Sequence, residues 1–403
     1  MLAPLVPETR GSVGAPLRKI TMQNSPTSQR QHFWDTLRAF LMLLGIPYHV
    51  ALCYQVGQDF IVHSGEAVPG FLEFSQTTHL FRMHAFFVVA EYFALLLLAR
   101  REPGAWLKGR FVRLGFPLVT TMVTLVPLMN LFCEWSNMPL HEAVPNWQHN
   151  AVRSGGYWVR HLWFLMALLY FSVAVAWLAS RFPAVKSGMV PDRIDAWGAR
   201  HFFWVVMALG TVIGIWEALA LEAFYMAGLN TNFPQQILRI DDIIIYAPWF
   251  ALGCVLARTR AMLERTCRIS IPVAIVGVGA IVLWLTIHSD VSPMTERFIA
   301  AFAAIGMTQV MIALARSLLD RPVPLVRRLT DSSFVVYLFH LPWIALLVLV
   351  LQPVPIPPAF KALAVTVLSF LFSYWAWQGI RRVPILSLLY DGVVIPSKRR
   401  APA

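Results

Sequence analysis

Long apolar segments constrain this chain more than any other feature of its sequence. A helix that crosses the hydrocarbon core of a bilayer needs about 20 mainly apolar residues. Because every backbone polar group in lipid must be satisfied within the segment, such segments predict helices. The sequence therefore predicts an all-α, polytopic integral membrane bundle of about ten transmembrane helices in one domain, residues 33–380. The ten segments cover roughly residues 33–57, 79–99, 111–132, 161–180, 201–220, 239–258, 270–288, 298–316, 331–351 and 359–379.

Composition agrees with this class and excludes others. Hydrophobic residues make up 58% of the 403 and charged residues only 13%, too few for the surface of a soluble domain of this length. The net charge of +12 does not indicate nucleic-acid binding, because the basic residues occur in short runs between apolar segments. Four scattered cysteines show no paired spacing, so neither a metal site nor a disulfide framework is predicted.

Lysine and arginine are distributed unequally between alternate connections. The two tails and the connections 100–110, 181–200, 258–269 and 316–330 carry 25 of them, and the opposite connections carry three, Arg153, Arg160 and Arg297. Basic residues accumulate on the cytosolic side of membrane proteins. Both termini are therefore predicted to lie in the cytosol.

The two tails differ in composition. Residues 1–32 are rich in Pro, Ser, Thr and Gln and lack an apolar h-region, so we expect a disordered cytosolic tail and not a cleaved signal peptide. Residues 381–403 are expected to form a basic cytosolic tail.

The first apolar segment contains "WDTLRAFLMLLGIPYHV", residues 34–50. Ionisable side chains inside a span are costly and are kept mainly for function. Arg38 and His49 are eleven positions apart, close to three full turns, so both point to one face about 16 Å apart. Pro47 is expected to bend the helix between them. Asp35 precedes Arg38 by one turn, within ion-pair reach.

Each of these residues also has an ordinary structural interpretation. Arg38 can extend to the interface, and His49 can be hydrogen-bonded inside the bundle. Together they favour a site for a long anionic molecule, with its phosphates at Arg38 and its reactive end at His49. An imidazole titrates near neutrality and can take a proton from an attacking hydroxyl. Coenzyme A has the right form for such a site, with phosphates at one end and a thioester on a long thin arm.

The block "RAFLMLLGIPYH" resembles the arginine–histidine motif of the acyltransferase-3 family of ten-span membrane acyltransferases. The chain is more closely similar to the glucan-modifying branch, the osmoregulated periplasmic glucan C proteins. Ala90-Glu91 stands where the family usually has Ser-Gly, and His84 stands where an apolar or amide residue is expected. Further matching blocks, in the family's order up to about residue 392, are "LFRMHAFFVVAEYF", "RHLWFLMALLYF", "SSFVVYLFHLPW" and "RRVPILSLLYDG".

The resemblance implies transfer of an acyl group, succinyl in this branch, from cytosolic acyl-CoA to hydroxyls of a periplasmic glucan at the bacterial inner membrane. His49 would be the catalytic base, and Arg38 would lie in the acyl-CoA channel. Direct transfer is favoured, and an acyl-histidine intermediate stays open. No bound cofactor is expected, with succinyl-CoA as a substrate.

Two arginines at the start of the third segment are candidates for the donor site. Arg110 and Arg113 are three positions apart on the predicted cytosolic side. They are either ordinary basic flanking residues or a second contact for CoA phosphates, which arginine binds in a bidentate manner.

The second segment contains a cation and an acid. Arg82 is either an interfacial arginine or a cation directed toward the site, and it is our choice for the succinyl carboxylate. Such a carboxylate needs a cation that phosphate does not use, because unpaired charge at this depth is costly. Glu91 must be protonated or paired, and it could repel the donor or occupy Arg82.

Three further residues are acceptor-site candidates. His161 and Trp163 begin the fourth segment, where an interfacial aromatic belt and a wall of the acceptor site both explain them. The resemblance of "HLWFL" favours the acceptor site. His340 on the ninth segment is expected to be structural more than catalytic.

Two other functions remain open on the sequence alone. A transporter or flippase of a glycan or lipid precursor would use Arg38, Arg82, Glu91 and His49 as a polar pathway. The sequence has no internal repeat of the kind many transporters show, which disfavours that function. The alternative within the enzyme class is an O-acetyltransferase of another surface polysaccharide.

Overall fold

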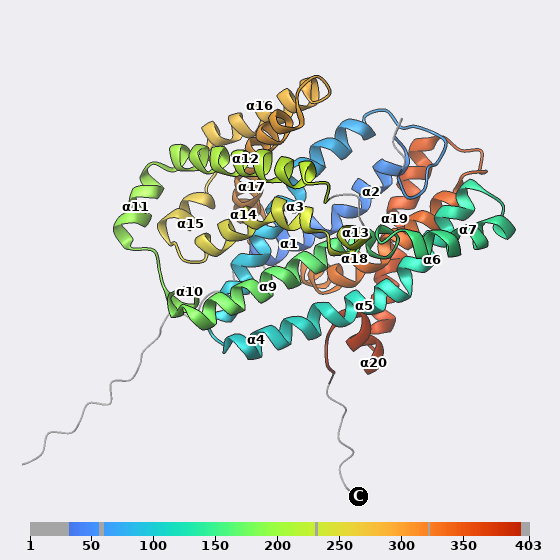
Figure 1. The fold of residues 1–403 in the computed structure, drawn as a ribbon, viewed down its shortest axis with the longest axis horizontal. Helices are drawn as coiled ribbons and strands as arrows, with labels where there is room; N and C mark the ends of the chain where they lie inside the picture. The colour runs from blue at the N-terminus through green and yellow to red at the C-terminus, as the bar shows by residue number, and fades with distance from the viewer. Residues whose placement is uncertain (1–31, 56–59, 230–232, 321–322, 396–403) are drawn as a thin grey trace, which may run out of the picture. The chain divides into compact units, whose positions relative to one another are not determined.

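The computed structural model describes residues 32–55, 60–229, 233–320 and 323–395. Apart from His32, the predicted N-terminal tail lies outside the described residues, as does the C-terminal tail from residue 396 on. The described residues form helices and no strand (Figure 1).

Eight helical segments are long and apolar enough to cross a membrane. Two more predicted spans are the 17-residue helices α14 (Ile240–Leu256) and α16 (Ile271–Ile287). Each is about 26 Å long, slightly short of a typical hydrocarbon core. The prediction of an all-α polytopic membrane bundle is confirmed. The eight segments are His32–Cys53 (α1 and α2), Phe71–Leu98 (α3), Pro103–Asn137 (α4, η1, α5 and α6), Gly156–Arg181 (α8, η2 and α9), Phe202–Met226 (α12), Pro293–Leu319 (α17), Pro324–Leu351 (α18) and Pro358–Ile380 (α19).

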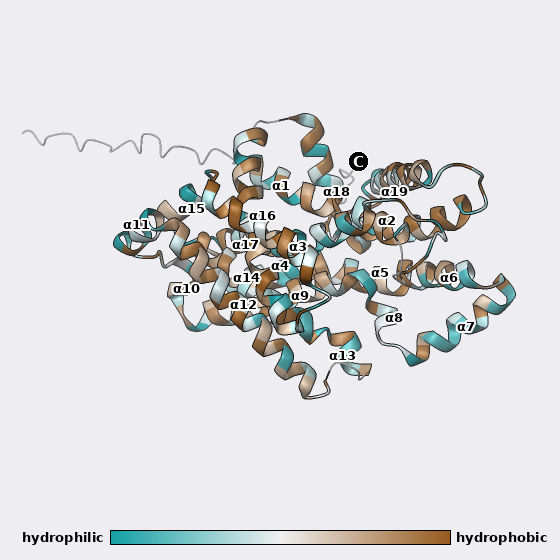
Figure 2. Ribbon diagram, turned by 90° about the horizontal axis from the view of Figure 1, so that it is seen from above, coloured by the Kyte–Doolittle hydropathy of each residue, from teal (hydrophilic) through white to brown (hydrophobic). Residues whose placement is uncertain are grey.

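Shorter helices connect the spans. In Figure 2, α7 and α11 carry hydrophilic colour at opposite ends of the view. The connecting helices are α7 (Leu140–Arg153), α10 (Pro183–Ser187), α11 (Asp192–Arg200), α13 (Phe233–Leu238), α15 (Ala261–Thr266), α20 (Pro384–Leu386) and the π-helical η3 (Ser387–Asp391).

Proline explains two breaks within the spans. A proline lacks the N–H that bonds the carbonyl four residues earlier, and its ring clashes with that carbonyl. Pro47 follows Leu43 by four positions, and α1 (His32–Leu43) ends there before α2 (Gly45–Cys53) begins. Pro127 has the same relation to Val123, where α5 (Phe116–Val123) ends before α6 (Leu125–Asn137). The predicted bend at Pro47 is confirmed as a change of helix.

Several basic connections meet at one end of the bundle. Lys186, after α9 (Trp163–Arg181), forms an ion pair of 3.0 Å with Glu102 before α4 (Pro103–Arg110). Arg258, after α14, donates to the carbonyl of Val185 at 2.9 Å. We call this the basic end. The basic connections that the charge distribution predicts on one side of the membrane therefore lie together. The assignment of that side to the cytosol stays a prediction.

The C-terminal segment after α19 is partly folded. The helix α20 and the π-helix η3 follow the last span, and η3 packs against α5. The carboxylate of Asp391 in η3 pairs with Arg113 in η1 (Phe111–Gly115) at 2.9 Å. The predicted basic tail therefore begins with a structured element that is tied to the third span.

Candidate active site

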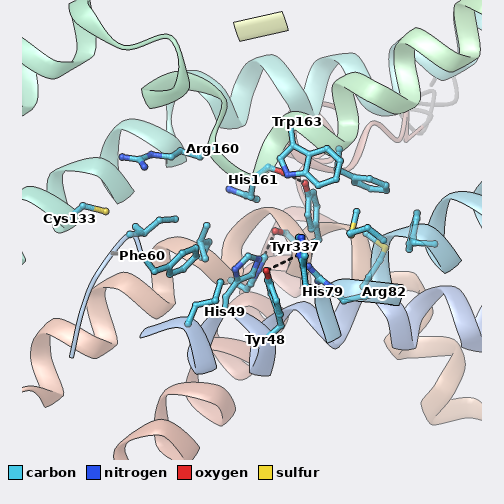
Figure 3. Close-up of a pocket in the computed structure, with 18 of the residues that line it drawn as sticks. Tyr48, His49, Phe60, His79, Arg82, Cys133, Arg160, His161, Trp163 and Tyr337 are labelled. Atoms are coloured by element: carbon cyan, nitrogen blue, oxygen red, sulfur yellow. Dashed lines mark hydrogen bonds between the residues drawn. The ribbon is translucent and has the colours of Figure 1, made fainter. Parts of the chain in front are cut away.

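A cavity of about 520 Å³ surrounds His49 (Figure 3). In the figure, Arg160, His161 and Trp163 lie opposite Tyr48 and His49. We call it the histidine cavity. Its ionisable and hydrogen-bonding lining residues include Tyr48 and His49 of α2, His79 and Arg82 of α3, Glu134 of α6, Arg160 and His161 of η2 (Arg160–Leu162), Trp163 of α9, and Tyr337 and His340 of α18.

The imidazole of His49 is held between rings. Its centroid lies 5.4 Å from that of Phe60 in a stacked arrangement and 5.3 Å from that of His340. Its Nδ1 atom is buried and has no hydrogen-bond partner among the described residues. The ring is therefore fixed by packing, while a nitrogen stays available for proton exchange.

Other polar atoms of the same cavity are also unpaired. Both ring nitrogens of His161 and Nε2 of His340 lack a partner in the part of the chain that the structure describes. Buried polar atoms are normally hydrogen-bonded. A group of unpaired imidazole nitrogens around one cavity indicates a site for a polar ligand.

Arg82 provides a cation to this cavity. Its guanidinium carbon lies 4.5 Å from the ring centroid of Tyr48, whose hydroxyl shares a hydrogen bond of 3.2 Å with Nδ1 of His79. Gly45 leaves room for it, because a Cβ atom there would lie 2.6 Å from Nη1 of Arg82. Within the described residues, Arg82 forms no ion pair with a carboxylate.

A second cavity, of about 330 Å³, lies toward the basic end and is lined by Arg38, Arg101, Arg110 and Arg113. We call it the arginine cavity. Arg110 donates from Nε to the Ser172 hydroxyl at 3.0 Å, and its Nη2 has no partner among the described residues. Arg113 is partly neutralised by the Asp391 carboxylate described above. Four cations around one cavity favour an anionic ligand with several charges.

The same three apolar side chains, Met42, Phe86 and Phe164, line both cavities. The rings of Phe86 and Phe164 meet edge to face, with centroids 4.8 Å apart. We call these three residues the septum. They come from α1, α3 and α9, so movement of any one of these helices would change how the cavities communicate.

Comparisons with known proteins identify the family of this chain. The family model described as "Acyltransferase domain" (Acyl_transf_3) matches residues 31–378. The chain belongs to this acyltransferase family. Proteins named "Glucans biosynthesis protein C" from Escherichia coli O81 (strain ED1a) and from Escherichia coli (strain K12) are each 25% identical to it, over 94% of this chain and all of theirs. No solved structure matches the chain. The protein is a multi-pass membrane acyltransferase.

The predicted site residues of this acyltransferase fall into two groups. Arg82, His161, Trp163 and His340 line the histidine cavity together with His49. The predicted donor residues Arg38, Arg110 and Arg113 line the arginine cavity. Arg38 and His49 thus lie on opposite sides of the septum, in place of one continuous groove along a single helix.

Two predicted candidates, Asp35 and Glu91, line neither cavity. The backbone carbonyl of Asp35 accepts a hydrogen bond from Thr330 at 3.5 Å. Glu91 is fully buried, and the Cys254 thiol donates to its Oε1 at 3.6 Å. Glu91 therefore does not occupy Arg82, contrary to one expectation from the sequence.

Several cavity residues were not identified from the sequence. His79 precedes Arg82 by three positions, so helical spacing alone could have placed it on the same face. Tyr48 adjoins His49 and carries the ring under Arg82. Arg160 and Glu134 lie near the ends of spans, where the sequence pattern does not distinguish a binding residue from an interfacial charge.

Proposed function

We propose that this protein transfers a succinyl group from cytosolic acyl-CoA to a hydroxyl of a periplasmic glucan, at the bacterial inner membrane. The observation that carries the proposal is the pair of cavities on either side of the septum, one lined by arginines and one by histidines. The glucan acceptor is suggested by the names of the Escherichia coli relatives.

The arginine cavity is the proposed binding site for the CoA phosphates. Guanidinium groups bind phosphate oxygens through paired N–H donors and keep their charge at all physiological pH values. Arg38 and Arg110 would make the principal contacts. Arg113 would contribute less, because Asp391 already pairs with it.

The pantetheine arm of CoA would pass through the septum to bring the thioester to His49. This arm is thin and mostly uncharged, so apolar side chains can close around it. Met42 supports such movement, because methionine is unbranched and adapts its conformation easily. When no donor is bound, the closed septum would prevent a water-filled path through the bilayer.

His49 is the proposed general base. It would take the proton of the acceptor hydroxyl as the hydroxyl oxygen attacks the thioester carbonyl. The carbon–sulfur bond then breaks, and the departing thiolate receives the proton from the imidazolium, which yields the ester and free CoA. In the alternative, an acyl-histidine forms first and the sugar hydroxyl attacks it.

Arg82 is the proposed partner of the succinyl carboxylate. A second negative charge near the thioester needs an uncommitted cation, since burial of an unpaired charge is costly. Arg82 faces the histidine cavity and forms no ion pair with a carboxylate of the described residues. Acetyl would leave this cation without a partner.

The test is an assay with purified protein in detergent, without sidedness. Labelled succinyl-CoA and a neutral gluco-oligosaccharide should yield labelled oligosaccharide and free CoA in equal amounts. Acetyl-CoA should react more slowly. A clear preference for acetyl-CoA would contradict the succinyl assignment, and absence of transfer from either donor would contradict the glucan acyltransferase proposal.

A further inference from the structure

A polar network lines the histidine cavity on the side away from the basic end, where Arg160 is partly exposed, and we call this side the mouth. Arg160 precedes α9, whose 19 residues separate it by about 28 Å from the basic end. Arg160 and Glu134 both line the cavity. This mouth is the side from which a molecule on the opposite face of the membrane from the proposed donor would enter.

Arg160 is held on two sides. Its guanidinium carbon lies 4.9 Å from the ring centroid of Tyr157, and its Nε donates to Oδ1 of Asn130 at 2.8 Å. Asn130 in turn donates from Nδ2 to the backbone carbonyl of Tyr157 at 2.5 Å. The side chain is thus fixed by an aromatic ring and an amide, both neutral. Its other guanidinium nitrogens have no hydrogen bond or ion pair within the described residues.

The backbone of Arg160 adopts a conformation that is uncommon for a residue other than glycine. Its φ is 45° and its ψ is −124°, at the junction of α8 (Gly156–Val159) and η2. Such conformations persist only where the surrounding contacts enforce them, and they are frequent at ligand sites. The contacts to Tyr157 and Asn130 are of this kind.

Glu134 is held by neutral donors. Nδ2 of Asn146 donates to its Oε2 at 2.5 Å, Nδ2 of Asn150 donates to its Oε1 at 2.9 Å, and the Tyr157 hydroxyl also donates to Oε1. A carboxylate has about four acceptor positions. Three are used here, so Glu134 retains capacity to accept one more hydrogen bond.

The charges at the mouth differ from those around Arg82. Among the lining residues of the histidine cavity, the formal charges are those of Arg82, Arg160 and Glu134. Glu134 balances Arg160 at the mouth without forming an ion pair with it, whereas Arg82 forms no ion pair with any acid in the part of the chain that the structure describes. An anionic group therefore suits Arg82, and a neutral molecule with donors and acceptors suits the mouth.

We propose that Arg160 and Glu134 form an acceptor subsite that binds hydroxyls of a neutral sugar unit and directs a neighbouring hydroxyl toward His49. The guanidinium donates to hydroxyl oxygens, and the carboxylate accepts a hydroxyl proton. His161 follows Arg160 in the chain, and both of its ring nitrogens lack a partner among the described residues, so it extends the subsite toward His49. This assignment rests on the proposed function for the identity of the acceptor.

The experiment compares Arg160→Gln and Arg160→Lys with a control variant, Arg153→Gln. Arg153 is exposed at the end of α7 and does not line the cavity. A neutral gluco-oligosaccharide is the probe. Its binding is measured without donor by calorimetry on the detergent-solubilised full chain, and its KM is measured in the transfer assay.

In Arg160→Gln, both the Kd and the KM for the oligosaccharide should rise about tenfold to a hundredfold, the usual effect of losing hydrogen bonds from a charged donor. Arg160→Lys should give an intermediate rise, because it keeps the charge and loses the paired donors. The KM for succinyl-CoA should stay unchanged in both variants, because the proposed donor contacts lie in the arginine cavity. Arg153→Gln should behave as wild type.

An unchanged oligosaccharide Kd in Arg160→Gln would overturn the subsite, even if wild-type transfer is robust. Equal loss of donor and acceptor binding in both variants would also overturn it, because Arg160 would then only support the fold. If the wild type binds the oligosaccharide through Arg160 and transfers no acyl group, the subsite stands and the proposed function fails.

Discussion

The arginine cavity and the histidine cavity border the same septum, and they hold their polar groups in different ways. In the arginine cavity, Arg110 is hydrogen-bonded to Ser172, and Arg113 is paired with Asp391. In the histidine cavity, the rings of His49 and His161 are positioned by packing, and the ring of His340 is held by a hydrogen bond of 2.7 Å between its Nδ1 and the carbonyl of Tyr337. Each of the three rings has at least one unpaired nitrogen in the described structure.

This difference suits the two cavities to different tasks, the arginine cavity to binding a charged ligand and the histidine cavity to a reaction. Cations anchored by the protein can hold a charged ligand without rearrangement, which suits the permanent charges of a donor. Imidazoles with unpaired nitrogens can accept and return protons, which suits a transfer step. The apolar septum would keep the arginine cavity and the histidine cavity apart, while the uncharged pantetheine arm of CoA passes between them.

Removal of His49 should have the largest effect. His49→Ala should lower the rate of transfer about 10²–10⁴-fold, because the general base is lost. The KM for succinyl-CoA should change little, since the phosphates bind on the other side of the septum. Initial rates of purified variants provide the measurement.

The matched control is His288→Ala. His288 stacks on Trp284, with ring centroids 4.2 Å apart, and does not line the histidine cavity. Wild-type activity in His49→Ala would show that His49 is not the general base and would contradict a chemical role for the histidine cavity.

Arg82→Ala should have the next largest effect, on one donor only. We expect kcat/KM for succinyl-CoA to fall about tenfold to a hundredfold, as for loss of a charge-assisted contact. Residual acetyl transfer should fall much less, because acetyl carries no carboxylate. Equal losses for both donors, measured side by side, would make Arg82 a structural residue of the cavity.

Changes in the arginine cavity should affect donor binding alone. Arg110→Gln should raise the KM for acyl-CoA about tenfold through loss of one phosphate contact, with the KM for the oligosaccharide unchanged. Arg327→Gln is the control, since Arg327 is exposed near the start of α18 and lines neither cavity. A larger effect on the oligosaccharide than on acyl-CoA would reverse the assignment of the two cavities.

Gly45→Ala should have the smallest effect. The new Cβ would lie 2.6 Å from Nη1 of Arg82, the end of a flexible side chain that can move aside. Succinyl transfer should therefore fall about fivefold, equivalent to about 1 kcal/mol, with stability retained. Gly104→Ala, where a Cβ meets nothing within 4 Å, is the control. If Gly45→Ala transfers succinyl at the wild-type rate, succinyl transfer does not depend on the position of the Arg82 guanidinium.

The sequence predicted the helices better than it predicted the geometry of the candidate site. Apolar segment length identified the spans, and Pro47 correctly indicated a change of helix after Leu43. Arg38 and His49 were expected to face one groove, because helical spacing treats the segment as continuous. Their separation by the septum depends on Phe86 and Phe164, which come from other helices.

Contacts between residues that are far apart in the chain could not be predicted from the sequence. Arg160 resembles an ordinary interfacial charge until Asn130 and Tyr157 are seen to hold it. The sequence left open whether Glu91 occupies Arg82 on the same segment, and the structure places the thiol of Cys254 of α14 against the Glu91 carboxyl. Such pairings depend on helix packing, which a single sequence does not reveal.

Transfer across a sealed bilayer tests the two-sided account most directly. Purified protein is reconstituted into vesicles that contain a neutral gluco-oligosaccharide, and labelled succinyl-CoA, which does not cross the bilayer, is added outside. Label should appear on the enclosed oligosaccharide and not on a distinguishable oligosaccharide added outside, and His49→Ala vesicles should show neither. Label that appears only on the external oligosaccharide would place donor and acceptor on the same side and contradict the account.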